Sequence, residues 1–462
     1  MILRDIFKYI AAVALVGFVS SCDLEETNID PDNPADADVN LILPSAQAGF
    51  AYVQGGDLGR YSNVLTQHLA GVGRQHLVIG RYQINETDVN NLWRFSLYPI
   101  MENTRLVIDK ATEEGSPHYS GVAKVMLANM IGVTTDAWGD VPFSQAFQGD
   151  ENFNPIYDPQ EQIYTNVQTL LDEGIAELQA TESFRSPDED DLIYGGDLTK
   201  WIKAAYTLKA RYYNHLSQVD PQQSAQQALA ALQNGFTSNA DNALFLFGSS
   251  ETEANPYYQF NEQRGDVVMG EFFVELLKSL NDPRLPAFVA PLDTDAEGNP
   301  IYEGATAGVA EDGSPMGPYY ASIDSPVPVI TYYEAKFIEA EANLRLGNNA
   351  EAATAYNEAV RAALESVTGT ADEAYLTQNA SATAGTISLE QIMTQKYIAM
   401  FTNIEAWTDY RRTGFPEIQT AQNALGPFPL RFPYPQSERL LNAANIPTGA
   451  VGVGDPVWWD RP

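Results

Sequence analysis

The sequence predicts a mainly α-helical protein, built as a tetratricopeptide-like helical-repeat superhelix with a second, irregular and loop-rich half. Apolar residues recur at three- and four-residue steps over long stretches, which is the period of an amphipathic helix. One pair of such stretches carries small and aromatic residues at the spacing of a tetratricopeptide repeat. A Gly- and Pro-rich segment over 281–328 interrupts the pattern, and irregular segments of that length are usually functional or disordered.

The N-terminus is typical of a bacterial lipoprotein export signal. Two basic residues precede an apolar run over 10–19, and small residues stand directly before Cys22, the only cysteine of the chain. As a helix this run measures about 15 Å, half of a bilayer core of about 30 Å, so it suits a cleaved signal better than a membrane span. We predict a signal peptide over 1–21 and a lipid anchor on Cys22. A plain secretory signal is the alternative.

The segment that follows is polar and rich in Asp, Asn and Pro. It predicts a flexible lipidated tether over 22–40, followed by a single domain over 41–462. Three acidic residues within 23–26 resemble the surface-export signals of outer-membrane lipoproteins. We therefore expect a protein anchored by lipid to the outer membrane and displayed on the cell surface.

The helical pattern is clearest over 160–178, where Asp158 is the expected N-cap and Pro159 the expected first-turn residue. Ser388 and Gln391 form a capping-box pattern that opens a predicted helix over 389–412. Comparable periodicity predicts further helices over 121–134, 199–218, 224–234 and 270–280.

The tetratricopeptide-like pair is predicted over 332–346 and 350–366. Its second helix carries Ala352, Tyr356 and Ala359, and small residues at these places let two helices approach closely while the ring fills the gap. A single pair cannot bury both its faces, so we expect further, degenerate repeats elsewhere in the chain.

The composition excludes one class of partner. The chain has 26 Lys and Arg against 61 Asp and Glu, a net charge of -35, and no block of basic residues. A phosphate-binding surface needs clustered positive charge, so no nucleic acid is expected as a partner. Aromatic residues make up 11% of the chain, with 24 Tyr, and aromatic side chains are common material for ligand platforms.

Several short phrases occur in a characteristic order behind the export signal. They are Trp138-Gly139-Asp140-Val141-Pro142-Phe143, Tyr194-Gly195-Gly196-Asp197-Leu198-Thr199-Lys200-Trp201, Asn281-Asp282-Pro283-Arg284-Leu285-Pro286, Glu339-Ala340-Glu341-Ala342, Glu405-Ala406-Trp407-Thr408-Asp409-Tyr410-Arg411-Arg412-Thr413-Gly414 and Arg431-Phe432-Pro433-Tyr434-Pro435-Gln436-Ser437-Glu438. Together they resemble the SusD/RagB family of nutrient-binding outer-membrane lipoproteins, in its SusD-like branch. The resemblance implies a non-enzymatic helical lid that captures a glycan or other nutrient and hands it to a TonB-dependent barrel transporter of the SusC type. It also implies that the repeats face the transporter and that loops of the other half hold the ligand.

The recognisable phrases themselves are more typical of scaffold than of a site. Trp138, Trp201 and Trp407 lie on or beside amphipathic helices, where a large ring usually packs in the core. The acidic residues Asp140, Asp197 and Asp409 are expected to cap helices or pair with cations.

A sugar-binding face needs flat aromatic surface and fixed polar groups, which loops supply. One predicted cluster lies in a single loop, and the resemblance places ligand contacts in this region: Arg81, Tyr82, Asp88, Asn90, Asn91 and Trp93. The alternative for Trp93 is that it packs as the first core residue of the next helix. A second predicted pair is Tyr319 and Tyr320, in the irregular segment.

Catalytic and metal-binding motifs are missing from the sequence. The four histidines have no ligand-like spacing, and the calcium-like start Asp293-Thr294-Asp295 has Gly304 where a closing Glu is needed. We predict no catalytic residue, no metal and no cofactor. Two other functions stay open at this point: a lipid-anchored glycan hydrolase, and a repeat scaffold that binds only proteins.

Overall fold

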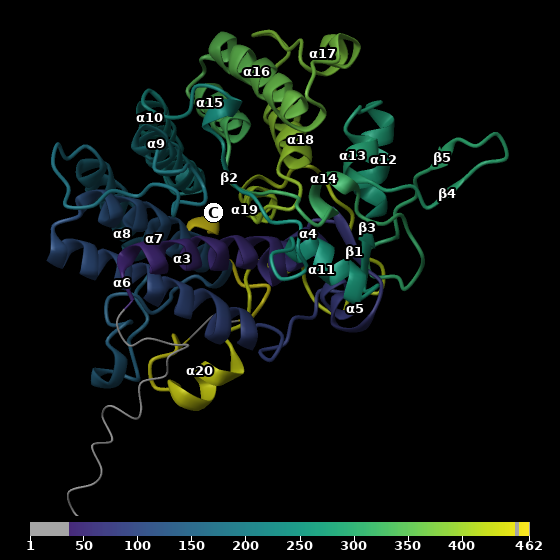
Figure 1. Cartoon of the computed structure of the whole chain (residues 1–462). Helices are drawn as coiled ribbons and strands as arrows, with labels where there is room; N and C mark the ends of the chain where they lie inside the picture. The colour runs from purple at the N-terminus through teal and green to yellow at the C-terminus, as the bar shows by residue number, and fades with distance from the viewer. Residues whose placement is uncertain (1–36, 449–451, 462) are drawn as a thin grey trace, which may run out of the picture.

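The computed structural model describes residues 37–448 and 452–461, and helices dominate it (Figure 1). The predicted signal peptide and Cys22 lie outside the described residues. Helix α3 begins at Val39 with a buried side chain, so the last two residues of the predicted tether over 22–40 belong to the folded body.

The α-helices cover both halves of the chain. They are α3 (Val39–Val53), α4 (Gly59–Leu65), α5 (Arg74–Gly80), α6 (Tyr98–Glu114), α7 (Pro117–Trp138), α8 (Gln160–Leu178), α9 (Leu198–His215), α10 (Pro221–Leu232), α11 (Pro256–Gln263), α12 (Glu271–Ser279), α13 (Leu285–Phe288), α14 (Pro318–Ala321), α15 (Tyr332–Arg345), α16 (Asn349–Thr368), α17 (Glu373–Asn379), α18 (Leu389–Ala399), α19 (Glu405–Thr413) and α20 (Gln436–Leu441). Two π-helical segments, η1 (Gln54–Leu58) and η2 (Leu92–Leu97), join these helices, and short 3-10 turns are η3 (Gly149–Glu151), η4 (Leu216–Gln218), η5 (Asn239–Asp241) and η6 (Trp458–Asp460).

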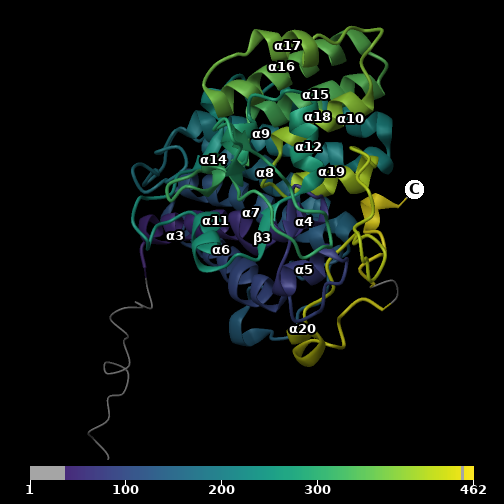
Figure 2. The ribbon, with the colours of Figure 1, turned by 90° about the vertical axis from the view of Figure 1, so that its right-hand side faces the viewer.

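The long helices pack in chain order into a superhelix. Helix α6 contacts α7, and the series continues through α8, α9, α10, α15 and α16, with α18 closing against both α15 and α16. Figure 2 shows α16 and α17 at one end of the molecule and α20 at the other. The prediction of a mainly α, tetratricopeptide-like superhelix is therefore confirmed.

Helix α8 has the predicted bounds, but its cap differs from the prediction. Its N-cap is Pro159, and the Asp158 carboxylate instead accepts hydrogen bonds from the amides of Phe143 and Ser144 at 2.8 and 2.7 Å. The first-turn amide of Gln160 is bound by Asp140, at 2.9 Å. Asp158 thus holds the preceding loop and does not cap the helix.

The predicted helix over 389–412 is two helices, α18 and α19. Its capping box is confirmed, since the Ser388 and Gln391 side chains each bind the other's amide. The helix stops because Thr402 takes a φ of 77°, in the left-handed region, and its amide donates to the Asn63 side chain at 3.0 Å. The contact between Asn63 and Thr402 thus interrupts a helix that the continuous apolar periodicity predicts.

The tetratricopeptide-like pair is formed by α15 and α16, which pack closely together. Ala352, Tyr356 and Ala359 are all buried, as the repeat pattern predicts. Thr331 caps α15 by accepting from the Glu334 amide, and Gly347, with a φ of 80°, turns the chain between the helices. These residues give the pair its close antiparallel packing.

The other half of the molecule is built from short elements and loops. Its strands pair two by two and antiparallel: β1 (Leu69–Gly71) with β3 (Val267–Met269), β2 (Ala243–Phe245) with β6 (Val327–Ile330), and β4 (Asp293–Thr294) with β5 (Pro300–Ile301). The β4–β5 hairpin projects from the body (Figure 1). Asp295 accepts from the amides of Glu297 and Asn299, so the calcium-like sequence forms a hydrogen-bonded turn.

The three tryptophans of the recognisable phrases are buried. Trp138 and Trp407 are fully buried and donate to the carbonyls of Pro433 and Pro429 at 2.9 and 3.0 Å. Trp201 is buried and donates to Asp191 at 2.7 Å. Each ring therefore fixes a loop to a helix, which is a scaffold role.

Candidate functional site

The predicted loop cluster does not form one exposed face. Tyr82 is 3% exposed, and its hydroxyl accepts from the Ala421 amide at 2.9 Å. Arg81 donates through Nε to the Gly308 carbonyl at 2.8 Å. Both side chains hold other loops in place, so Tyr82 offers no open ring for a sugar.

Trp93 is a core residue in the structure. It is 4% exposed and packs against Tyr98, Trp138 and Tyr157, with ring centroids 4.7, 5.2 and 6.4 Å away. The expectation that Trp93 lies on an open platform does not match this burial. The apolar surroundings of the first turn keep the ring inside, which is the alternative that the sequence left open.

Two of the three remaining polar residues of the predicted cluster also bind other parts of the chain, and one is exposed. Asp88 accepts from the Asn85 amide at 2.7 Å and closes a turn, while Asn90 accepts from the Ser437 amide at 3.1 Å. Asn91 is exposed just before η2. Of these three residues, Asn91 alone presents a side chain that is open to a ligand.

The second predicted pair is also largely internal. Tyr320 is 3% exposed and stacks on Phe288 with centroids 5.7 Å apart. Tyr319 is half-buried, and its hydroxyl donates to the Ser366 carbonyl at 2.9 Å. The short helix α14 turns one ring into the core and ties the other to α16, so the two rings do not form a platform.

Next to the predicted loop, the structure opens a groove of about 600 Å³. We call it the aromatic groove. It lies between α3, η1, α4, η2, α6 and α11, and the residues lining it are Ser45, Gly49, Tyr52, Val53, Gly56, Asp57, Arg60, Leu92, Phe95, Ser96, Pro99, Ile100, Asn103, Pro256, Gln259, Phe260 and Gln263. Phe95 is 69% exposed and Tyr52 is 42% exposed. This volume is in the range of small-molecule sites.

Both π-helical segments contribute to this groove. Gly56 and Asp57 come from η1, whose Gly56 has a non-helical φ and ψ, and Phe95 comes from η2. π-Helical turns are rare, and they often mark functional sites because they redirect side chains. Because two π-helical segments line the same groove, we take this groove as the candidate site.

The polar groups of the groove are held firmly. Arg60 binds Asp57 at 2.6 Å, and its guanidinium lies 4.2 Å from the centre of the Phe260 ring. The Tyr52 hydroxyl donates to Gln259. Burial raises the pKa of Tyr52 above its usual value, so this hydroxyl stays a donor at neutral pH.

His76 of α5 supports the groove from behind. Its ring is buried and meets the Phe260 ring edge-on at 5.0 Å. Burial, followed by the charge of Arg60, lowers the pKa of His76 to about 4. His76 is therefore neutral at physiological pH and acts as an aromatic support for Phe260.

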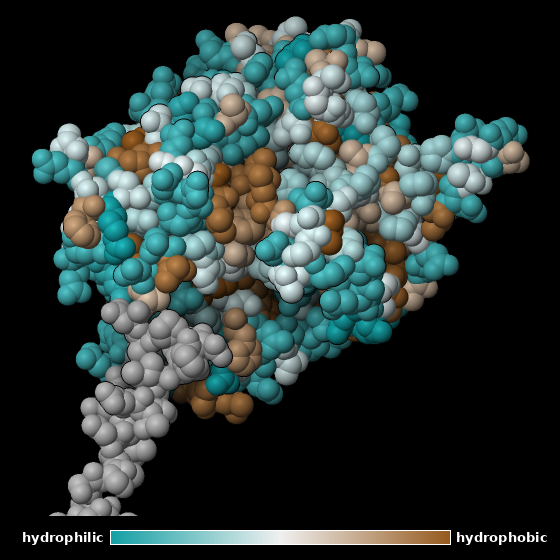
Figure 3. All heavy atoms as spheres, in the orientation of Figure 1, coloured by the Kyte–Doolittle hydropathy of each residue, from teal (hydrophilic) through white to brown (hydrophobic). Residues whose placement is uncertain are grey.

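Apolar side chains continue beyond the groove. Tyr52 meets Phe247 edge-on at 6.1 Å, and Phe247 packs on a small cluster of Ala51, Phe245 and Val327. Figure 3 shows hydrophobic side chains gathered on this face above α3 and beside β2. The half-buried Phe247 therefore continues the apolar lining of the groove beyond Tyr52.

A second groove, of about 530 Å³, lies between α12 and the loops at 305–307 and 419–422. Arg81 and Tyr82 stand behind its wall, since they hold Gly308 and Ala421. Its aromatic residue, Phe272, is only half exposed. It offers less flat surface than the aromatic groove does.

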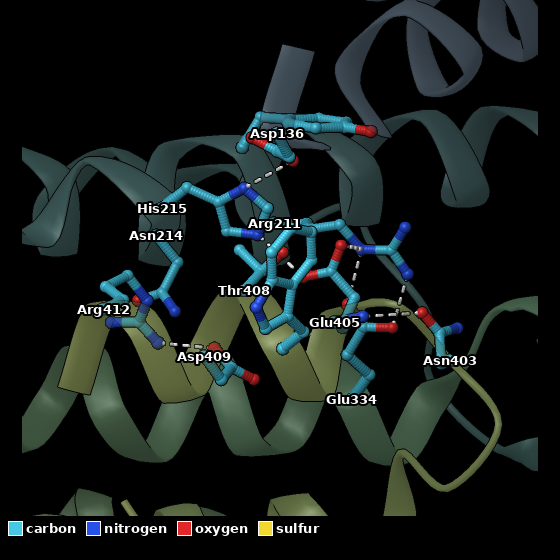
Figure 4. A network of polar contacts seen from close by, with 12 residues as sticks. Asp136, Arg211, Asn214, His215, Glu334, Asn403, Glu405, Thr408, Asp409 and Arg412 are labelled. Atoms are coloured by element: carbon cyan, nitrogen blue, oxygen red, sulfur yellow. Dashed lines mark hydrogen bonds and ion pairs between the residues drawn. The ribbon is translucent and has the colours of Figure 1, made fainter. Parts of the chain in front are cut away.

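A buried ionic network lies in the scaffold (Figure 4). His215 of α9 binds Glu405 through Nε2 at 2.8 Å and faces Asp136 through Nδ1 at 3.3 Å. Burial opposes its charge, but Glu405 and Asp136 outweigh burial and raise the pKa of His215 to about 9. The same network holds Arg211 to Glu334 at 2.6 Å.

This network is structural rather than catalytic. Asp136, His215 and Glu405 could in principle hold a metal ion, but the two ring nitrogens point in opposite directions, each at a different carboxylate. That arrangement suits an imidazolium and not a chelate. All three side chains are at most 1% exposed, so a glycan has no access to them.

Sequence reasoning missed Tyr52, Arg60 and Phe95. A signal for Phe95 was present, because residues two apart in a helix are separated by about 200° and lie on opposite faces. Once Trp93 is placed in the core, Phe95 must point outward. Tyr52 and Arg60 carry no such local signal, since α11 completes their surroundings from far along the chain.

The fold and the groove together define a helical-repeat protein with an open, ligand-sized aromatic site. The family model described as "Starch-binding associating with outer membrane" matches residues 31–435, and the chain belongs to this SusD-like family. The resemblance seen in the sequence is confirmed. Members of this family are binding proteins that associate with the outer membrane. None of the curated proteins matches the chain.

Solved structures agree over nearly the whole length. A chitin-binding protein is 28% identical, with 92% of this chain and 100% of that chain covered and a TM-score of 0.79. A SusD/RagB family protein from Bacteroides thetaiotaomicron is 26% identical, with 92% and 99% covered and a TM-score of 0.75. A chitin-binding SusD homolog from Flavobacterium johnsoniae, 22% identical with 90% and 99% covered and a TM-score of 0.73, shares the fold.

Within residues 37–448 and 452–461, none of the helices combines the length and the apolar character that crossing a bilayer requires.

Proposed function

We propose that this protein captures a glycan at the cell surface and delivers it to a TonB-dependent barrel transporter of the SusC type, without bond chemistry of its own. The observation that carries the proposal is the aromatic groove, where Phe95 and Tyr52 are exposed beside fixed polar groups. Sugar rings stack their apolar C–H face on such rings while their hydroxyls meet polar side chains. Family membership supports both the glycan and the outer membrane.

The residues of the predicted loop enter this proposal in different roles. Asn91, exposed one residue before Leu92 of the groove, adds a polar group at the rim. Arg81 and Asp88 act indirectly, since they order loops near the two grooves. The relative that is named as chitin-binding makes chitin oligosaccharides the first ligands to test, and the family description adds starch oligosaccharides.

The anchor and the partner complete the proposal. A lipid on Cys22 would tether the folded body through residues 22–38, and the helical repeats would face the transporter while the groove faces the incoming glycan. The described body contributes its groove and repeat surfaces without a membrane-spanning helix of its own.

Replacing Phe95 by alanine tests the groove directly. We expect Phe95→Ala to weaken glycan binding at least about tenfold, roughly 1.4 kcal/mol, because it removes the most exposed ring of the site. The melting temperature should stay within about 2 °C of the unmodified protein, since the ring is outside the core. Isothermal titration calorimetry with chitin and starch oligosaccharides, together with thermal unfolding, measures both effects.

Phe184→Ala is the matched control. Phe184 is 73% exposed, lies outside the groove and carries a neighbouring arginine over its ring, as Phe95 does. Equal loss of binding in both variants, or full binding in Phe95→Ala, would remove the groove from the proposal.

A further inference from the structure

The charges that line the aromatic groove are balanced. Among the described residues, Asp57 and Arg60 are the charged ones of the lining, and they form an ion pair with Nη2 and Oδ1 2.6 Å apart. The exposed Arg94 stands beside the lining, with its guanidinium 5.4 Å from the centre of the Phe95 ring. The Arg60 side chain is 10% exposed and the Asp57 side chain 32% exposed. Because the pair is partly buried, salt screens it less than an exposed pair.

Arg60 is also already engaged. Asp57 holds one end of its guanidinium, the Phe260 ring covers its face at 4.2 Å, and its buried Nε finds no hydrogen-bond partner among the described residues. A ligand carboxylate would therefore have to approach Arg60 beside the carboxylate of Asp57. A hydroxyl meets no such repulsion and can bind both members of the pair, as donor to Asp57 and acceptor from Arg60; an N-acyl group does the same by donating through its N–H and accepting through its carbonyl.

The net charge of the whole molecule also disfavours the binding of anionic ligands. Its net charge is -35, with 61 acidic against 26 basic residues. A field of one sign lowers the local concentration of ligands of that sign and slows their association. A polyanionic glycan is thus disfavoured both at a distance and in the groove.

We infer that the aromatic groove selects uncharged glycans, whose hydroxyl or N-acyl groups bridge Asp57 and Arg60, and discriminates against acidic ones. This inference rests on the proposed function and names its ligand class. The ion pair offers the ligand a donor and an acceptor without net charge. Each charge offsets the desolvation cost of the other in a partly buried site, so the ligand needs no charge of its own.

Calorimetric titration with two kinds of hexasaccharide tests the inference. The probes are neutral chitin, starch and cellulose hexamers and an acidic galacturonate hexamer. We expect a neutral hexamer to bind at least about tenfold more tightly than the acidic one at 0.15 M salt. Its affinity should change less than about twofold between about 0.01 M and about 1 M salt, although the Debye length falls from roughly 30 Å to roughly 3 Å.

The variant Asp57→Asn leaves Arg60 unbalanced. We expect the ratio of acidic to neutral hexamer affinity to rise about tenfold at low salt, because the groove gains net positive charge. Glu373→Gln is the matched control: it removes the same charge from an exposed pair with Arg361, 3.0 Å apart, far from the groove lining. That ratio should not change in the control.

The outcomes separate the two claims. If no hexamer binds, the proposed capture function fails and the inference fails with it. If the acidic hexamer binds as tightly as the neutral ones, capture stands and the selection of neutral glycans is wrong. Should Asp57→Asn not fold, the salt series on the unmodified protein decides, since strong salt dependence of the best ligand contradicts the inference.

Discussion

At the scale of single residues, burial decides which aromatic side chains can serve a ligand. The sequence shows that the chain is rich in aromatic residues, but Phe95 and Tyr52 are the ones exposed in the groove, whereas Tyr82, Trp93 and Tyr320 are buried. Loop position alone could not separate them, because distant parts of the chain surround such rings: α11 lines the groove beside Tyr52, and the Ala421 amide binds Tyr82.

Trp93 gives a direct test of this assignment. We expect Trp93→Ala to lower the free energy of unfolding by about 3 to 5 kcal/mol, because it empties the space between Tyr98, Trp138 and Tyr157. Chemical denaturation measures the loss. Near-wild-type stability combined with lost glycan binding would instead place Trp93 in the site.

His215 predicts a pH dependence of stability. Its pKa is about 9 in the folded protein against 6.5 when exposed, so its charge stabilises the fold fully below pH 6.5 and that contribution is lost as the pH rises through about 9. The shift corresponds to roughly 3 kcal/mol. Denaturant unfolding between pH 6 and pH 10 should show this decline.

The control for His215 is its uncharged replacement. His215→Gln should be less stable at pH 6, since Asp136 and Glu405 lose the cation between them, and its stability should fall much less steeply towards pH 10. Parallel pH profiles for both proteins would show that other groups, such as tyrosines and lysines, cause the decline.

At the scale of elements, helices whose signals are local could be predicted closely. The bounds of α8 follow from its apolar period, and the capping box at Ser388 sets the start of α18. The predictions that were wrong depend on contacts with distant parts of the chain. The predicted helix over 389–412 is interrupted where the Asn63 side chain binds the amide of Thr402. The two π-helical segments likewise have no clear sequence signal, although they line the groove.

The same distinction explains the irregular half. Residues 281–328 could be recognised as non-repeating from their Gly and Pro content, but their pairing could not. Strand β6 pairs with β2, more than eighty residues earlier, and Val289 bridges Met316. Packing between distant segments determines such long-range pairs, so the local periodicity of the sequence cannot predict them.

At the scale of the whole molecule, the described residues build a large hydrophobic core among themselves. This core runs from Val39 to Trp459, and the ionic network and the buried tryptophans link α7, α9 and α19 with the C-terminal loops. Capture of a glycan and attachment to the membrane should therefore be separable, with Cys22 responsible for attachment and the aromatic groove for capture.

Cys22→Ser tests this separation in cells that export the protein. Because one thiol would carry all the lipid, the variant should leave the membrane fraction and become soluble, while its purified folded body keeps the glycan affinity and melting temperature of the unmodified protein. Detergent extraction of the unmodified protein should also recover a TonB-dependent barrel transporter. Two results would contradict the lipid anchor: a Cys22→Ser variant that stays membrane-bound in cells lacking that transporter, or a mature N-terminus whose mass includes no acyl chain. Extraction of the unmodified protein without any barrel protein would contradict the proposed partner.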